Sequence, residues 1–177
     1  PYVAQLVAEL AKIGSPINPQ ERAIYLTRLV QVGQGQAAYA EWLRAQRSAG
    51  GAAAPLSWDS GFEQVPAVGA LGAPFEWRLT PESTGVVGVV PSPKQGKQLS
   101  ISPGSDYRGT LVSQTMVLKP GRYALTARVE GDAAATGLHW TIRCLPANVE
   151  LALDTGRGDA EFGAATFAVP AACTAQT

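Results

Sequence analysis

The first 48 residues repeat their apolar positions with the period of an α-helix. One stripe has i, i+3, i+4, i+7 and i+10 spacing and comprises Val3, Leu6, Val7, Leu10 and Ile13. A second helix is predicted to start at Asn18, with Pro19 at its first position and Glu21 closing a capping box. The apolar stripe of this helix comprises Ala23, Leu26 and Val30. A third helix is predicted over 36–46, and its stripe comprises Ala38, Trp42 and Ala45. Three short amphipathic helices predict the tail of a helical-hairpin array over 1–48.

The pattern changes after Ser48. Residues 49–55 are rich in Gly and Ala and are interpreted as a linker. From 56 to 177, short strand-forming stretches alternate with clusters of Pro, Gly, Asp and Ser, which is typical of an all-β sandwich. Two of these stretches alternate apolar and polar residues. In the first, the positions predicted to face the core are Tyr123, Leu125, Ala127 and Val129. In the second, they are Leu138, Trp140, Ile142 and Cys144. The turn 119–121 is predicted to join antiparallel neighbours.

The β region resembles the jelly-roll sandwiches of the galactose-binding-like and carbohydrate-binding-module group. The residues that match the group's hairpin are Gln114, Met116, Leu118, Pro120, Gly121, Tyr123 and Leu125. Its late "FxVP" strand is matched by Phe167, Val169 and Pro170, and its first strand by "WDSGFEQ" at 58–64. The resemblance implies a mainly β fold over 56–177, a jelly-roll β-sandwich preceded by a short α-helical segment. The stretch "GQGQAAYAEWLRA" at 33–45 resembles the first helix of a tetratricopeptide repeat.

Charge and hydropathy exclude some classes of partner. The chain has 14 basic and 14 acidic residues, so neither nucleic acid nor an anionic membrane is predicted as a partner. No apolar run approaches the roughly 18 residues that a membrane helix needs. No signal peptide is visible, and because Pro1 lies inside a helical pattern we expect the chain to be a piece of a longer protein.

A polar strip is the main candidate for ligand binding. If the strands that contain them pair, Arg122, Thr126 and Arg128 share one non-core face with His139, Thr141 and Arg143. In a jelly roll such a face can form a sugar cleft, in which Arg and His donate to hydroxyl groups. Because Trp140 and Trp77 are expected to point to the core, Trp58 is the freest aromatic side chain. The predicted ligand-binding set is Arg122, Arg128, His139, Thr141, Arg143 and Trp58, and the alternatives are a solvated face or a docking surface for the helical segment.

Catalytic and metal sites have little support in the sequence. His139 is the only histidine, and no Ser or Cys nucleophile motif accompanies it. The "DTG" at 154–156 has the form of an aspartic-protease motif but occurs once, and it is interpreted as a turn, as is the "RGD" at 157–159. Asp59 and Glu63 lie where related sandwiches hold calcium, but two carboxylates are too few to define that site. We therefore predict no catalytic residues, no metal and no cofactor.

The two cysteines, Cys144 and Cys173, form either a disulfide or a pair of buried thiols, and the disulfide is favoured. It would close a loop of about 29 residues and imply an oxidising, periplasmic or extracellular compartment. The function predicted from these features is a non-catalytic, carbohydrate-binding-like module of an exported bacterial protein, concerned with the cell envelope or an exopolysaccharide. Its partner would be a glycan or an envelope protein. The alternative is a structural or protein-interaction scaffold without a sugar ligand.

Overall fold

The computed structural model describes residues 17–48, 56–80, 85–93, 96–104, 109–130, 138–153 and 162–177, together with Gln5 and Glu9. In these ranges the chain is mainly β, with α2 (Pro19–Gln31) and α3 (Gly35–Ser48) ahead of the strands. The predicted stripe at 3–13, the linker at 49–55 and the turns at 154–159 lie outside the described residues.

The start of α2 is the predicted capping box. The Asn18 side chain accepts from the Glu21 N–H (2.9 Å), and the Glu21 carboxylate accepts from the Asn18 N–H (3.0 Å). The predicted stripe of Ala23, Leu26 and Val30 is buried. Neither α2 nor α3 is long and apolar enough to cross a membrane.

The strands form small antiparallel sheets. Their bounds are β1 (Arg78–Leu79), β2 (Gly85–Ser92), β3 (Gly96–Pro103), β4 (Val112–Ser113), β5 (Gly121–Arg128), β6 (Ile142–Leu145), β7 (Val149–Leu151), β8 (Phe162–Val169) and β9 (Ala175–Gln176). β1 pairs with β4, β2 with β3 and β5 with β8, while β6 lies between β7 and β9. A bridge between Met116 and Gln176 connects the continuation of β4 to β9. Through this bridge, β1, β4, β9, β6 and β7 form one central layer.

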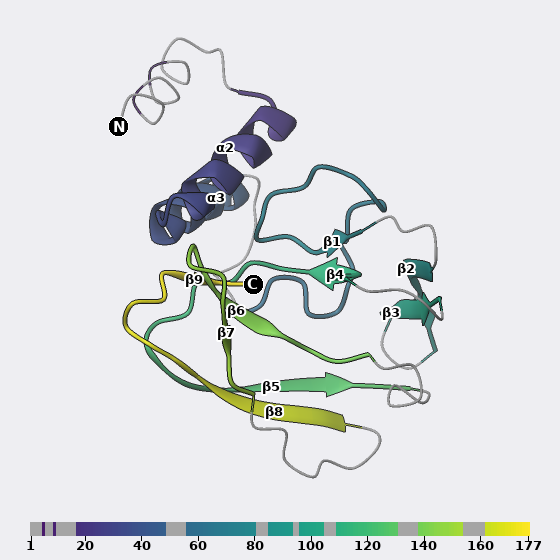
Figure 1. Ribbon diagram of the computed structural model, residues 1–177. Coiled ribbons are helices and arrows are strands. Elements are labelled where there is room, and N and C mark those ends of the chain that lie inside the picture. Colours follow the sequence, from purple (N-terminus) through teal and green to yellow (C-terminus); the bar gives the residue numbers. More distant parts are fainter. Residues whose placement is uncertain are drawn as a thin grey trace.

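The central layer lies between the helices and the β5–β8 pair (Figure 1). One of its faces packs on β5 and β8 through a group of side chains that we call the inter-sheet core: Leu118, Ile142, Cys144, Phe167, Val169 and Cys173. On its other face it packs on α2 and α3 through the helix core: Leu26, Val30, Ala38, Trp42, Ala73, Phe75 and Ala175. Since Ala175 and Cys173 are two residues apart, the segment 173–177 contributes to both cores.

The prediction that the turn 119–121 joins paired strands is wrong. Met116 pairs with Gln176, whereas β5, on the other side of the turn, pairs with β8. The chain therefore crosses from the central layer to the outer one at this turn, where the Tyr123 hydroxyl donates to the Lys119 carbonyl (2.8 Å). Apolar alternation cannot separate the two cases, because strands in facing layers and strands in one hairpin both present their apolar side chains to the same core.

The prediction that Trp140 lies in the core is also wrong. β6 begins only at Ile142, and Trp140 precedes it with 43% of its surface exposed. Within the strand the predicted alternation is confirmed, because Ile142 and Cys144 are buried and Arg143 is exposed. The predicted alternation starts at Leu138, four residues before the strand itself begins.

The predicted disulfide between Cys144 and Cys173 is confirmed, with a Cα–Cα distance of 5.3 Å. It ties β6 to the segment that follows β8. Neither cysteine is a free thiol.

The two aromatic side chains Phe75 and Trp140 should contribute differently to stability. We expect Phe75→Ala to lower the free energy of unfolding by about 3–5 kcal/mol, because the ring is 1% exposed and its loss leaves a cavity. Trp140→Ala should cost about 1 kcal/mol or less, since a large part of that ring is already in water. Urea unfolding of both variants measures the difference, and equal losses would contradict the exposure of Trp140.

Candidate functional site

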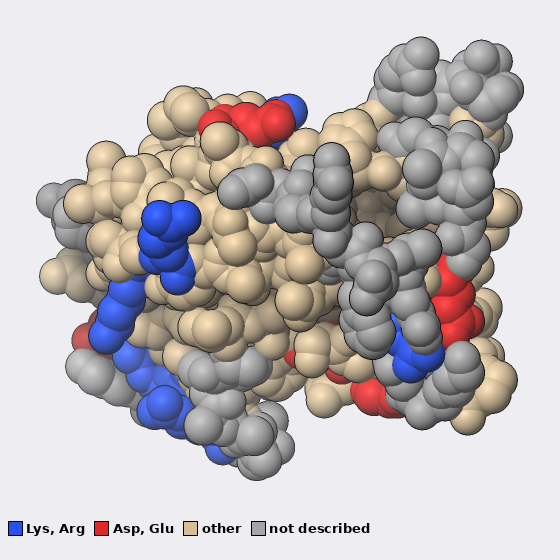
Figure 2. All heavy atoms as spheres, turned by 90° about the horizontal axis from the view of Figure 1, so that it is seen from below, with Lys and Arg blue, Asp and Glu red and all other residues tan. Residues whose placement is uncertain are grey.

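The predicted polar strip is divided between two faces of the molecule. β5 pairs with β8, so Arg122, Ala124 and Thr126 share their face with the exposed residues Ala168, Thr166 and Ala164. Arg128, at the end of β5, is half-buried. This outer face is uncharged over most of its area: in Figure 2, which views the molecule from this side, residues that carry no charge fill the centre and basic side chains lie along one side.

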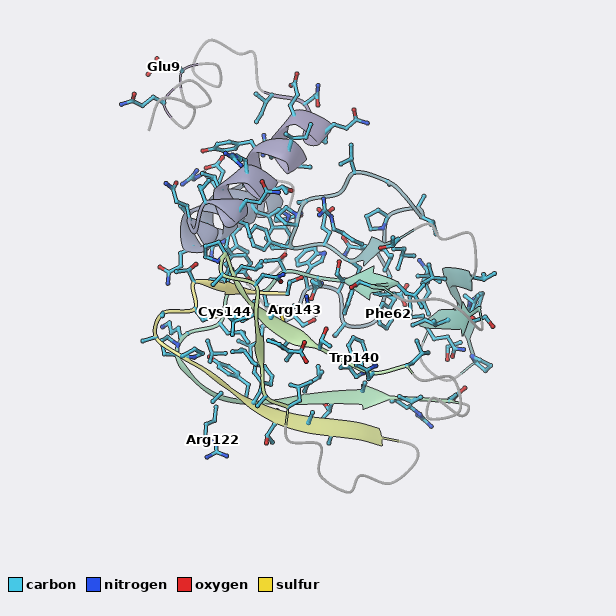
Figure 3. All side chains as sticks on the ribbon, in the orientation of Figure 1. Glu9, Phe62, Arg122, Trp140, Arg143 and Cys144 are labelled. Carbon is cyan, nitrogen blue, oxygen red and sulfur yellow. A yellow bond between two sulfur atoms is a disulfide. The ribbon has the colours of Figure 1, made fainter. Side chains whose placement is uncertain are left out.

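Arg143 lies on the other side of the molecule. It is paired in register with Glu150 of β7, and the two exposed side chains approach to 3.5 Å between Nη2 and Oε2. Arg143 also exchanges backbone hydrogen bonds with Thr177. Figure 3 shows Arg122 projecting away from the molecule below β5, whereas Arg143 lies in the layer above. The residues of the predicted strip therefore fall into two separate groups. One contains Arg122 and Arg128, and the other lies around Arg143.

The face of β6 that carries Arg143 also supports the helices. Leu145, two residues further along the strand, packs against the helix core. Gly33, in the turn between α2 and α3, lies against the Pro146 ring, and a Cβ on it would be 3.5 Å from that ring. The helices therefore pack on β6 beyond Arg143, at Leu145 and Pro146.

Trp58 is not the freest aromatic side chain. It is half-buried against the helix core, where its ring meets Trp42 edge-on with 4.8 Å between ring centroids. Its carbonyl accepts from the Gln114 side chain (2.8 Å). Trp77, predicted to point inward, is half-buried and donates to the Asp59 carbonyl (2.9 Å). Both side chains therefore hold the loop 56–77 in place.

The two carboxylates found too few to define a calcium site, Asp59 and Glu63, belong to the same loop. Asp59 accepts from the backbone N–H groups of Glu63 and Gln64, both at 2.8 Å. Lys97 donates to the Glu63 carbonyl (2.8 Å) and lies 3.7 Å from its carboxylate. Among the residues that the structure describes, no three or more His, Cys, Asp or Glu side chains gather as metal ligands would.

Two tyrosines in the helical part have perturbed titration. Burial raises the pKa of Tyr39 above 10.0, and burial together with the charge of Glu41 raises that of Tyr25. Both side chains pack against the helix core.

Trp140 is the side chain that sequence reasoning missed. It lies beside the exposed His139 and the half-buried Thr141, just before β6, and Figure 3 places it at the end of that strand farther from the helices. Exposed indole rings are enriched where proteins bind partners, because they offer a large rigid apolar face with one N–H donor. No signal in the sequence marks it, because Trp140, Thr141 and Ile142 all favour strands. We take Trp140 with His139, Thr141 and Arg143 as the candidate site.

No protein-family model matches the chain, and no curated protein or solved structure matches it. The candidate site therefore depends on its own geometry.

The division of the polar strip can be tested with charge coupling. A double-mutant cycle of Arg143→Ala with Glu150→Ala should give a coupling of roughly 0.2–1 kcal/mol that falls with added salt, as expected for an exposed ion pair. The same cycle with Arg122→Ala in place of Arg143→Ala should give no coupling, because Arg122 lies on the opposite face. Equal coupling in the two urea-unfolding cycles would show that the strip is continuous.

Proposed function

We propose that this chain is a non-catalytic binding module of the carbohydrate-binding kind, built on a jelly-roll-type sandwich. The observation that carries the proposal is the exposed indole of Trp140. The apolar face of an indole can lie against the C–H face of a sugar ring, and polar groups at its border can then fix the orientation of the hydroxyls. His139 and Thr141 are its neighbours in the chain, and Arg143 follows three positions after it.

Two observations support binding without catalysis. Both cysteines are joined in the disulfide, so neither thiol is available as a nucleophile. His139 is the only histidine of the sequence, and the common catalytic arrangements need a nucleophile or a second titrating group beside it.

The disulfide is compatible with an oxidising compartment. Within this proposal the chain acts outside the cytoplasm of a bacterium, in a periplasmic or extracellular protein concerned with the cell envelope or an exopolysaccharide. Its ligand is then a glycan or a glycan-bearing envelope protein.

The proposal is tested by calorimetric titration with a panel of neutral oligosaccharides. A sugar that binds the native chain should bind Trp140→Ala at least about tenfold more weakly, because truncating a central aromatic contact commonly costs 2 kcal/mol or more. Leu71→Ala is the matched control, because Leu71 is also an exposed apolar side chain (58%) but lies in the loop ahead of β1. Binding unchanged by Trp140→Ala would remove this site, and no binding by any sugar on a wide glycan array would remove the carbohydrate proposal.

A scaffold without a sugar ligand is the second candidate, and the helix core favours it. Tyr39 and Trp42 of α3 interlock with Phe75 of the β region, with ring centroids 5.1 and 5.5 Å from that of Phe75. In this candidate the β layers serve to hold the helices in a fixed orientation. Two results together would favour the scaffold. The native chain would bind no sugar on a glycan array but would capture an envelope protein, and this capture would be lost when α2 and α3 are unfolded.

A further inference from the structure

A close contact between the helices and the β layers is at Gly35, the first residue of α3. A Cβ on Gly35 would lie 2.7 Å from the Ala175 Cβ and 3.0 Å from the Thr174 carbonyl oxygen. Neither atom belongs to a flexible side chain, so α3 rests directly on the backbone at 174–175. Ala175 is fully buried there, within the helix core.

The same segment is held from its other side by the disulfide. Cys173 lies in the inter-sheet core and is bonded to Cys144 of β6. The remaining attachments to β6 are the short β9 ladder, the backbone bonds of Thr177 with Arg143, and a 3.3 Å bond from the Thr174 hydroxyl to the Leu145 carbonyl. A single covalent bond thus fixes the start of the segment on which α3 rests.

We propose that the Cys144–Cys173 disulfide controls how firmly α2 and α3 are docked on the β layers. A dithiol reductant cleaves the bond through a mixed disulfide: each cysteine gains one electron and one proton to become a thiol, and the dithiol becomes a cyclic disulfide. Once the bond is cleaved, Thr174 and Ala175 can move away from Gly35, and the helices undock more often. By linkage, undocking of the helices must favour reduction to the same degree.

Hydrogen exchange of the native chain before and after dithiothreitol reduction tests the proposal. The amides of α2 and α3 should exchange at least about tenfold faster in the reduced chain. Those of β2 and β3, which pair only with each other in the described part of the chain, should change less than about twofold. Unchanged helix amides would overturn the proposal. An equal increase in α2, α3, β2 and β3 would also overturn it, because the bond would then be a general stabiliser.

A pair of glycine variants tests the reverse direction without altering the cysteines. In Gly35→Ala the new methyl group meets Ala175, whereas in Gly88→Ala it meets no atom within 4 Å. The dithiothreitol concentration that reduces half of the Gly35→Ala chains should therefore be at least about threefold lower than for the native chain. For Gly88→Ala this concentration should equal that of the native chain. Helix propensity alone predicts the opposite sign, because alanine stabilises a helix more than glycine does. Identical reduction curves for the two variants would contradict the linkage.

Discussion

The five residues 173–177 are the constraint on which the rest of the structure depends. Cys173 is bonded to β6 within the inter-sheet core, and Ala175 lies beneath α3 within the helix core. At Ala175 and Gln176 the backbone pairs with β6, and Gln176 also forms a bridge with Met116 on its other side. Removing this segment would leave both cores open and would separate β6 from the continuation of β4 at Met116.

Two buried glutamines give the central layer its specific pairing. Gln176 is fully buried, and its side chain accepts from the Leu118 N–H (2.9 Å) and donates to the Cys173 sulfur (3.2 Å). Gln114 accepts from the Ser57 hydroxyl (2.9 Å) and donates to the Trp58 carbonyl (2.8 Å). A shift in register would leave these amides buried without partners, at a cost of about 1–3 kcal/mol each. The polar groups therefore favour one alignment of strands whose apolar pattern alone permits several.

Local features of this fold could be predicted from the sequence, and long-range pairing could not. The capping box at Asn18 and the buried faces of α2 and β6 follow from side chains within a few positions of one another. The pairing of β5 with β8 depends on contacts across some forty positions, and no pattern along β5 identifies that partner. The candidate site was misplaced for this reason, since Arg122 and Arg143 share a face only if β5 and β6 are neighbours. The disulfide was predicted because two cysteines allow a single pairing.

The central claim is that the helices and both β layers form one cooperative unit through residues 173–177. Urea unfolding of the oxidised chain tests it directly when the helices are followed by far-ultraviolet ellipticity and the inter-sheet core by the NMR signal of Tyr123, which stacks on Phe167. The account predicts that both signals are lost at one midpoint with one dependence on urea. Loss of the helical signal at a clearly lower urea concentration, with the Tyr123 signal still native, would contradict it.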